Sequence, residues 1–153
     1  MIALIFAASL PACLAAADVP SGASPVAITR LFLKAIAAQD EAAIRQLCLP
    51  NHALSKLWTT PLSPADKLEL DQTEKDDLRV LKAGEVIPIA GVNHPIPPAF
   101  ATASNVLVYA KSVTNPYNLV KFNGEWRINA GPIVAAIEKQ ETQARLAAIK
   151  AAH

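Results

Sequence analysis

The sequence predicts an α+β domain in which N-terminal helices pack on a curved antiparallel sheet and a C-terminal helix follows. Between positions 25 and 48, apolar residues recur at the three- and four-residue spacing of helices. Between positions 78 and 130, short runs rich in β-branched and aromatic residues alternate with turn signals, which is typical of strands. After Gly131-Pro132 the chain becomes Ala-rich and returns to a helical pattern.

The composition limits the class of protein. The chain has 153 residues, a formal net charge of +1 and a hydrophobic content of 52%. This length suits one domain with a sizeable core, and the apolar content excludes a disordered chain. Because the charge is near neutral, we expect no nucleic-acid partner and no strong binding to anionic membranes.

The first helix is predicted from Pro25 to near Gln39. Ser24 precedes the proline, as an N-cap precedes the first helical position. The predicted core face consists of Ile28, Leu31, Phe32, Ala35 and Ile36. These positions lie on one side of a helix, so the segment is expected to be amphipathic.

Three further helical segments are expected before the sheet. Asp40 is placed to cap a helix over 41–48, which Pro50 ends. A short helix is expected to contain Leu54, Leu57 and Trp58, with Asn51 as its cap. Between 65 and 77 the apolar pattern is poor, so one or two turns with a solvated charged face are predicted.

Residues 78–81 and 86–89 are predicted to form two short strands or one bent strand, and further strands are predicted at 106–113, 117–122 and 125–130. The proline-rich stretch 91–104 is expected to be an extended connection. Asn123-Gly124 predicts a two-residue hairpin turn, because both residues tolerate positive φ. That turn pairs Phe122 with Glu125, Lys121 with Trp126 and Leu119 with Ile128. The face with Tyr117, Leu119, Trp126 and Ile128 is the more apolar and should receive the helices.

Residues 1–17 predict export from the cytoplasm. The apolar run from Ile2 to Leu10 is too short for a membrane span, so no transmembrane span is expected. Ala15-Ala16-Ala17 fits signal cleavage before Asp18. In a second interpretation Leu10-Pro11-Ala12-Cys13 resembles a lipobox, which would anchor the chain through a lipid on Cys13. A third treats the segment as a buried N-terminal helix.

The predicted organisation is a signal peptide (1–17), a linker (18–23), an α+β domain (24–138) and a C-terminal helical tail (139–153). We expect the processed chain in the periplasm or cell envelope. No internal repeat and no second domain are indicated.

No pattern in the sequence supports catalysis. The predicted strands contain no Asp, Glu125 is expected to be solvated, and Asp40 is expected to cap a helix. His52, His94 and His153 are scattered, so neither a metal nor a cofactor is expected. Cys48 lies between leucines and is predicted to be a core residue rather than a nucleophile.

Three aromatic residues are the candidate ligand-binding residues: Trp58, Tyr117 and Trp126. Aromatic side chains on an apolar face can wall a pocket or simply fill the core. Core packing is the competing interpretation for each of them.

Two stretches carry a resemblance to a known family. Pro25-Val26 through Leu31-Phe32-Leu33-Lys34-Ala35, followed by Gln39-Asp40-Glu41-Ala42-Ala43, resembles the opening of the nuclear-transport-factor-2-like superfamily. The stretch from Leu119 through Asn123-Gly124 to Ile128 looks like its last hairpin. The resemblance implies a cone-shaped α+β fold enclosing a pocket, in a superfamily that includes isomerases, cyclases and dehydratases as well as members that only bind or dimerise.

These observations favour a non-catalytic binding or interaction module of the bacterial cell envelope. Its expected partners are a small apolar ligand or a second copy bound through the sheet. One alternative is a small isomerase or cyclase that transfers protons in the same pocket. Another is a structural accessory domain of envelope assemblies.

Overall fold

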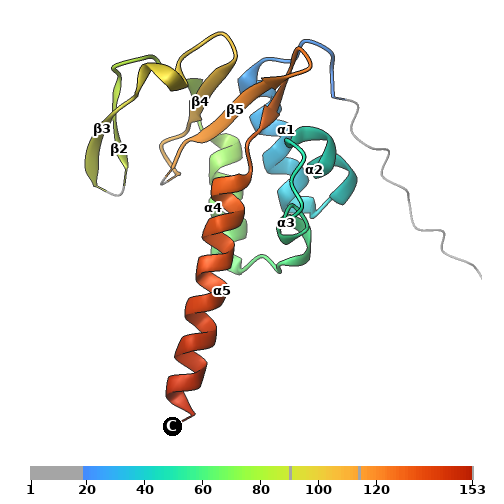
Figure 1. The fold of residues 1–153 in the computed structure, drawn as a ribbon, viewed down its shortest axis with the longest axis vertical. Coiled ribbons are helices and arrows are strands. Elements are labelled where there is room, and N and C mark those ends of the chain that lie inside the picture. Colours follow the sequence, from blue (N-terminus) through green and yellow to red (C-terminus); the bar gives the residue numbers. More distant parts are fainter. Residues whose placement is uncertain (1–18, 90, 114, 153) are drawn as a thin grey trace, which may run out of the picture.

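The computed structural model describes residues 19–89, 91–113 and 115–152. The elements are α1 (Pro25–Ala38), α2 (Glu41–Leu47), α3 (Lys56–Thr59), α4 (Pro64–Lys75), β1 (Arg79–Val80), β2 (Val86–Ile89), β3 (Val92–Pro95), the 3-10 helix η1 (Pro98–Phe100), β4 (Asn105–Tyr109), β5 (Tyr117–Phe122), β6 (Glu125–Ile128) and α5 (Gly131–Ala151). Helices pack on a small antiparallel sheet, and α5 runs down past the body (Figure 1). The predicted α+β class is confirmed.

Helix α1 forms where the sequence predicts it. The Ser24 side chain accepts a hydrogen bond from the Ala27 backbone N–H at 3.2 Å, and a proline follows the cap. The helix ends at Gln39, whose φ of +51° turns the chain out of the helical path. Its buried face includes Ile28 and Phe32, and the helix contacts α2, α4, β1, β4 and β6. Helix α1 is therefore the central element of the core.

A side-chain cap starts α2, and a hydrogen-bonded glutamine joins α1 to the short helix α3. Asp40 accepts a hydrogen bond from the Ala43 N–H at 3.1 Å, as predicted for the start of α2. Helix α2 ends one residue before the predicted Cys48, because Cys48 is extended and bridges in parallel to Ile128. The Gln39 amide donates to the carbonyl oxygens of Trp58 (3.2 Å) and Thr60 (2.9 Å), which joins the end of α1 to the end of α3.

Asn51 does not cap α3 directly. Its side chain accepts from the Ala53 N–H at 2.8 Å and so closes the turn that precedes the helix, whereas Ser55 is the N-cap position. Leu54 lies in this turn and is buried, while Leu57 is buried within α3. The observed helix α3 is therefore shorter than the predicted helix, and it begins after Leu54 rather than before it.

Helix α4 corrects the prediction of one or two turns. It runs for 12 residues, and Ser63 with Asp66 forms a capping box at its start. At its other end the Arg30 guanidinium donates to the carbonyl oxygens of Glu74 (2.5 Å) and Asp76 (3.1 Å). The buried residue on this helix is Thr73. Capping at both ends thus sustains a helix with almost no apolar face, which periodicity cannot detect.

The main sheet has the strand order β1-β4-β5-β6 and is antiparallel throughout. Pairing of Phe122 with Glu125, Lys121 with Trp126 and Leu119 with Ile128 confirms the predicted register. Leu119 and Ile128 are fully buried, and α1 contacts β6 and β4. The predicted helix-facing side of the sheet is therefore confirmed.

Strand β4 is shorter than the predicted 106–113. It ends at Tyr109, and Ala110 to Val113 form a turn in which the Val113 N–H bonds to the Ala110 carbonyl. Val108 pairs with Tyr117, so Tyr109 lies on the opposite face from the helices. Strand β6 likewise ends at Ile128, two residues before the predicted end, because α5 begins at Gly131.

The expected connection over 91–104 contains a strand. Val92 to Pro95 pairs with β2 as a hairpin, with Ile89 opposite Val92 and Val86 opposite Pro95. Gly91 has a φ of +79°, which suits the turn between these strands. Because β3 has a single partner strand, a proline can stand on its free edge without losing a ladder bond. The prolines of this stretch predicted a connection, but a proline does not exclude a strand at the edge of a sheet.

The last hairpin depends on backbone conformation rather than on packing at its turn. Asn123 has a φ of +52° and Gly124 a φ of +83°, and a Cβ at Gly124 would meet nothing within 4 Å. Replacing Gly124 with Val should therefore cost about 1–2 kcal/mol through backbone strain alone. Gly124→Asn should cost less, because Asn tolerates this conformation. Chemical denaturation of both variants gives the comparison, and equal stabilities would contradict the strain argument.

Candidate functional site

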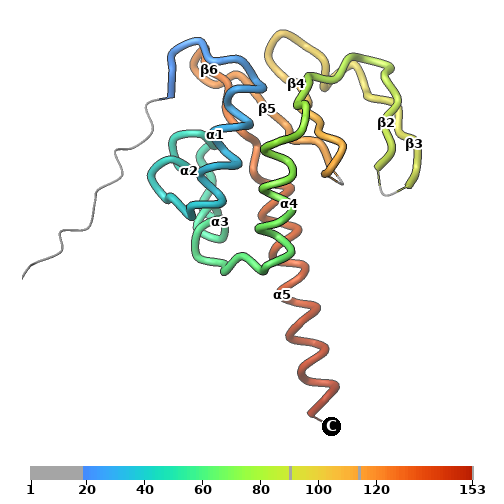
Figure 2. The backbone as a smooth tube through the Cα atoms, turned by 180° about the vertical axis from the view of Figure 1, so that it is seen from behind, coloured from blue at the N-terminus to red at the C-terminus, as the bar shows by residue number. Residues whose placement is uncertain are grey.

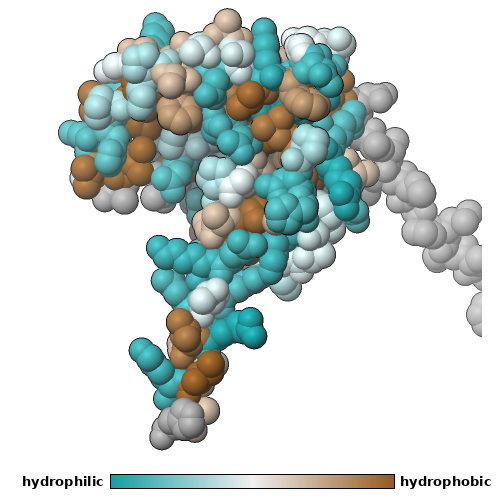
Figure 3. Space-filling model, viewed as in Figure 1, coloured by the Kyte–Doolittle hydropathy of each residue, from teal (hydrophilic) through white to brown (hydrophobic). Residues whose placement is uncertain are grey.

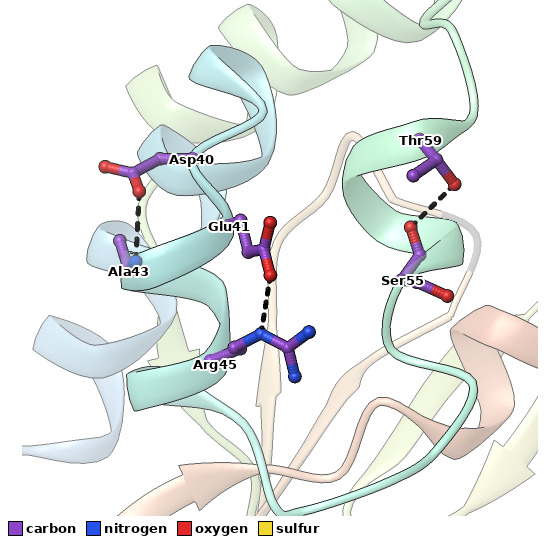
Figure 4. Close-up of polar contacts among 6 residues, drawn as sticks. All are labelled: Asp40, Glu41, Ala43, Arg45, Ser55 and Thr59. Atoms are coloured by element: carbon purple, nitrogen blue, oxygen red, sulfur yellow. Dashed lines mark hydrogen bonds and ion pairs between the residues drawn. The ribbon is translucent and has the colours of Figure 1, made fainter.

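Trp58 lies on α3 and is half-buried. The Arg45 guanidinium stands over its ring, 4.7 Å from the centroid, and also pairs with Glu41 at 2.8 Å. Figure 4 shows Arg45 and Glu41 projecting from α2 on the side toward Ser55 and Thr59. Arg45 also lines an open hollow with Pro50, Asn51, His52 and Leu54. Trp58 thus packs against a cation beside a shallow surface.

Tyr117 lies at the start of β5, where the sheet meets α1. Its ring makes an edge contact with Phe32, with centroids 6.2 Å apart. Burial raises the pKa of Tyr117 to about 12, and the nearby Glu69 carboxylate acts in the same direction. The phenol therefore stays protonated at physiological pH. This environment fits a packing residue at the edge of the core.

Trp126 lies on β6 next to the linker before α1. The Lys121 ammonium is 5.3 Å from its ring centroid, across the hairpin. Trp126 helps to line a hollow of about 120 Å³ together with the linker residues Val19, Pro20, Gly22 and Ala23. That volume is well below the roughly 300 Å³ at which small-molecule pockets begin.

The three predicted aromatic residues therefore lie in three different settings. Trp126 lines the hollow beside the linker, and neither Trp58 nor Tyr117 is among the lining residues of the two hollows described above. The structure shows Trp58 at the junction of α2 and α3, and Tyr117 against Phe32. It does not join them into one wall.

The two acidic residues considered for catalysis, Asp40 and Glu125, have structural partners. Asp40 caps α2, and the Glu125 carboxylate pairs with Arg127 at 2.6 Å. Among the described residues, no group of three or more His, Cys, Asp and Glu side chains could hold a metal ion. Within the same part of the chain, no helix is long and apolar enough to cross a membrane.

One polar cluster was not anticipated from the sequence. Asp76 accepts a hydrogen bond from the Ser112 N–H at 2.8 Å, and the Ser112 hydroxyl lies 3.0 Å from that of the buried Thr73. Hydrogen bonds from Ser112 hold the pKa of Asp76 below its usual range. The cluster joins the end of α4 to the turn after β4, which are 36 residues apart. The lowered pKa makes the Asp76 carboxylate a weak base, so we interpret the cluster as structural.

Cys48 is a core residue, as predicted. Its side chain is 2% exposed, and burial raises the pKa of the thiol to about 12. In a Cys13→Ser variant, Cys48 is the only thiol, and it should react slowly with a thiol-specific reagent at pH 8 until denaturant is added. Rapid labelling of the native protein would show that the core opens around Cys48. Since the folded state disfavours the thiolate, stability should fall as the pH rises above about 9.

One of the exposed apolar surfaces belongs to α5. Its packed side includes Val134, Ile137 and Glu141, and Glu141 pairs with Lys56 of α3 at 2.5 Å. Every residue from 142 to 152 is exposed, and Leu146 and Ile149 are 54% and 58% exposed. Figure 1 shows this half of α5 projecting beyond the body, and Figure 3 shows hydrophobic side chains on it.

The sequence indicated a weakly amphipathic tail here but did not identify it as a surface. Figure 2 shows from behind that the last turns of α5 stand apart from the other elements. We name residues 142–152 the free half of α5. Comparisons with protein-family models, with curated proteins and with solved structures found no match. The fold and this surface therefore define the chain as an α+β domain with a projecting helix.

Proposed function

We propose that this chain is an exported, non-catalytic interaction module of the bacterial cell envelope, which binds a protein partner through the free half of α5. The observation that carries the proposal is the exposure of Leu146 and Ile149 on a helix that projects beyond the domain. In the body the buried apolar side chains form one core, and the large apolar side chains that stay exposed lie on four different parts of it: Leu68 on α4, Val80 on β1, Val86 and Val92 on the β2–β3 hairpin, and Phe122 on β5. Two large aliphatic side chains that are close together on a projecting helix fit a binding surface.

A partner protein would both cover and stabilise the free half of α5. An isolated helix of this length is marginal in water, and every residue in the free half of α5 is exposed. A groove that covered Leu146 and Ile149 would remove their exposed area from water and stabilise the helix at the same time. Arg145 and Lys150 are the charged residues of the free half, so acidic groups on a partner would complement it.

The alternatives have less support from the described residues. A bound apolar ligand would need more room than the hollow of about 120 Å³ beside Trp126. The hollow beside Arg45 is larger, about 690 Å³, but it is open to solvent, and Arg45, Asn51 and His52 are among its lining residues. A proton-transfer enzyme would need a carboxylate inside a pocket, whereas Asp40 and Glu125 are engaged as a helix cap and an ion pair. The interaction surface is therefore the function that the geometry favours.

The export part of the proposal is supported by the first 17 residues, which lie outside the described residues. Cleavage before Asp18 would leave all of the described chain in place, since it begins at Val19. The intact mass of the protein from the envelope fraction should match a chain that starts at Asp18. A lipid on Cys13 would make the domain membrane-tethered, and a cytoplasmic protein retaining Met1 would contradict export.

Site-specific photo-crosslinking tests the interaction. A photoreactive residue is placed at position 146 or 149 of the full chain, in the cells that make it, with position 68 on α4 as the control. Leu68 is 58% exposed and lies on a different element, so it matches Ile149 in accessibility. We expect discrete adducts from 146 and 149 and none from 68. No adduct from either α5 position would refute the proposal.

A further inference from the structure

The exposed side of α5 carries a stripe with the spacing of a helix-pairing seam. Its members are spaced at intervals of four, three, four and three residues: Ala135, Lys139, Thr142, Leu146 and Ile149. All five are exposed, because α5 packs on the body through a different side that contains Val134, Ile137 and Glu141. Alternating three- and four-residue spacing places these side chains along one line of the helix, as at the contact between two paired helices.

The charges beside this stripe are self-complementary. Glu138 and Arg145 each precede a stripe residue, Lys139 and Leu146, so they lie on the same flank seven residues apart. When two α5 helices lie antiparallel, matching flanks face each other, and Glu138 of one copy lies opposite Arg145 of the other. The two-fold axis makes this contact twice. Among the described residues, neither side chain forms an ion pair within its own chain, so both are available.

A parallel arrangement fails the same test. In parallel pairs, opposite flanks of the two helices face each other. Arg145 would then meet Lys150 of the other copy, and Lys139 would face its own counterpart across the seam. Like charges at such positions are destabilising. The antiparallel arrangement avoids both contacts and places Lys139 opposite Thr142.

The antiparallel register also matches side-chain sizes. With Glu138 opposite Arg145, Leu146 of one copy lies opposite Ala135 of the other. A large side chain then meets a small one, which allows two helices to approach closely. The stripe continues to Ile149, so the two exposed aliphatic residues of the free half both enter the contact. Pairing would cover the stripe over most of the length of α5.

We propose that the partner of α5 is a second copy of this chain, paired antiparallel through α5 in a two-fold symmetric dimer held by reciprocal Glu138–Arg145 ion pairs. This inference rests on the proposed function, because it names the occupant of the same surface. It places the dimer contact on α5 rather than on the sheet, where pairing was expected from the sequence.

Charge reversal tests the pairing. The processed protein, purified after export, is studied by sedimentation equilibrium over a range of concentrations. The unaltered chain should pass from monomer to dimer as the concentration rises. Glu138→Lys and Arg145→Glu should each weaken dimerisation by at least about tenfold, because each places like charges opposite each other. The double variant E138K/R145E should return to within about threefold of the unaltered chain.

A matched control and a fold check accompany these variants. Lys67→Glu changes the net charge as Arg145→Glu does, but Lys67 is exposed on α4, so it should leave the dimer unchanged. Circular dichroism should be unaltered in all variants, because the replaced side chains are exposed. A monomer at every concentration, or a double variant that stays as weak as the singles, would overturn the inference.

The two proposals fail separately. If the chain is monomeric but positions 146 and 149 crosslink to another protein, the antiparallel dimer is wrong and the interaction surface stands. If positions 146 and 149 give no adduct, the proposed function fails. The third outcome is a crosslink from position 146 that joins two copies of the chain. If this crosslink is lost in Glu138→Lys and regained in the double variant, both proposals are supported.

Discussion

Replacing Phe32 with Ala should destabilise the fold by about 3–5 kcal/mol, more than any exposed substitution in the chain. Phe32 is 2% exposed and lies on α1, which contacts α2, α4 and three strands of the sheet. Its ring also packs edge-on against Tyr117. Alanine would leave a cavity where the helices meet the sheet. The loss of stability therefore combines the transfer free energy of the missing ring with the cost of the cavity.

The measurement is thermal and chemical unfolding of the exported protein. For a domain of this size the loss corresponds to a fall in Tm of about 10–15 °C. Phe122→Ala is the matched control, because Phe122 is 43% exposed at the end of β5. It should cost no more than about 1 kcal/mol. Similar losses in the two variants would mean that Phe32 is not at the centre of the core.

The second large effect is expected from Arg30→Met. The guanidinium of Arg30 supplies donors to the carbonyl oxygens of Glu74 and Asp76, which lie at the end of α4. Met keeps the apolar stem but removes both donors, so two carbonyl groups lose their partner. Hydrogen bonds from a charged donor are worth about 1.5–3 kcal/mol, and we expect a loss of about that size. The last turn of α4 should fray first, which hydrogen exchange of its amides would show.

Arg45→Met is the control for this prediction. Arg45 has an exposed side chain, an i,i+4 pair with Glu41 and a contact with the Trp58 ring. Exposed contacts of this kind are worth about 0.5–1 kcal/mol. Arg30→Lys keeps the charge but lacks the forked donor, so it should fall between Arg30→Met and the unaltered chain. Amide exchange in α4 that is no faster in Arg30→Met than in the control would contradict the capping function.

Local signals account for the elements that the sequence predicted well. The Ser24 and Asp40 caps act on N–H groups three residues away, and the Asn123-Gly124 turn joins adjacent strands. The free energy that these caps and this turn contribute depends on residues that are neighbours in the sequence. The structures that they form can therefore be predicted without knowledge of the tertiary fold. The register of β5 and β6, and with it the helix-facing side of the sheet, follows from that turn.

The candidate site was harder to predict, because it depends on contacts between distant segments rather than between neighbours in the sequence. The sequence identifies Trp58, Tyr117 and Trp126 as large apolar surfaces, but whether they meet depends on how the helices cross the sheet. In the structure each has its own neighbour: Arg45 for Trp58, Phe32 for Tyr117 and Lys121 for Trp126. The surface on α5 for which we propose a function depends equally on which side of that helix the body covers. An Ala-rich pattern by itself has no strong apolar face from which to predict it.

By itself, the sequence determined the α+β class, the bounds of α1, the start of α2 and the β5–β6 register. Only the tertiary structure decided the length of α4, the strand within the proline-rich stretch and the free half of α5. The length of α4 depends on Arg30, whose bond to the Asp76 carbonyl spans 46 residues of sequence. The physical reason is range: caps and turns act between neighbours in the chain, whereas burial and long-range hydrogen bonds arise only when distant segments meet.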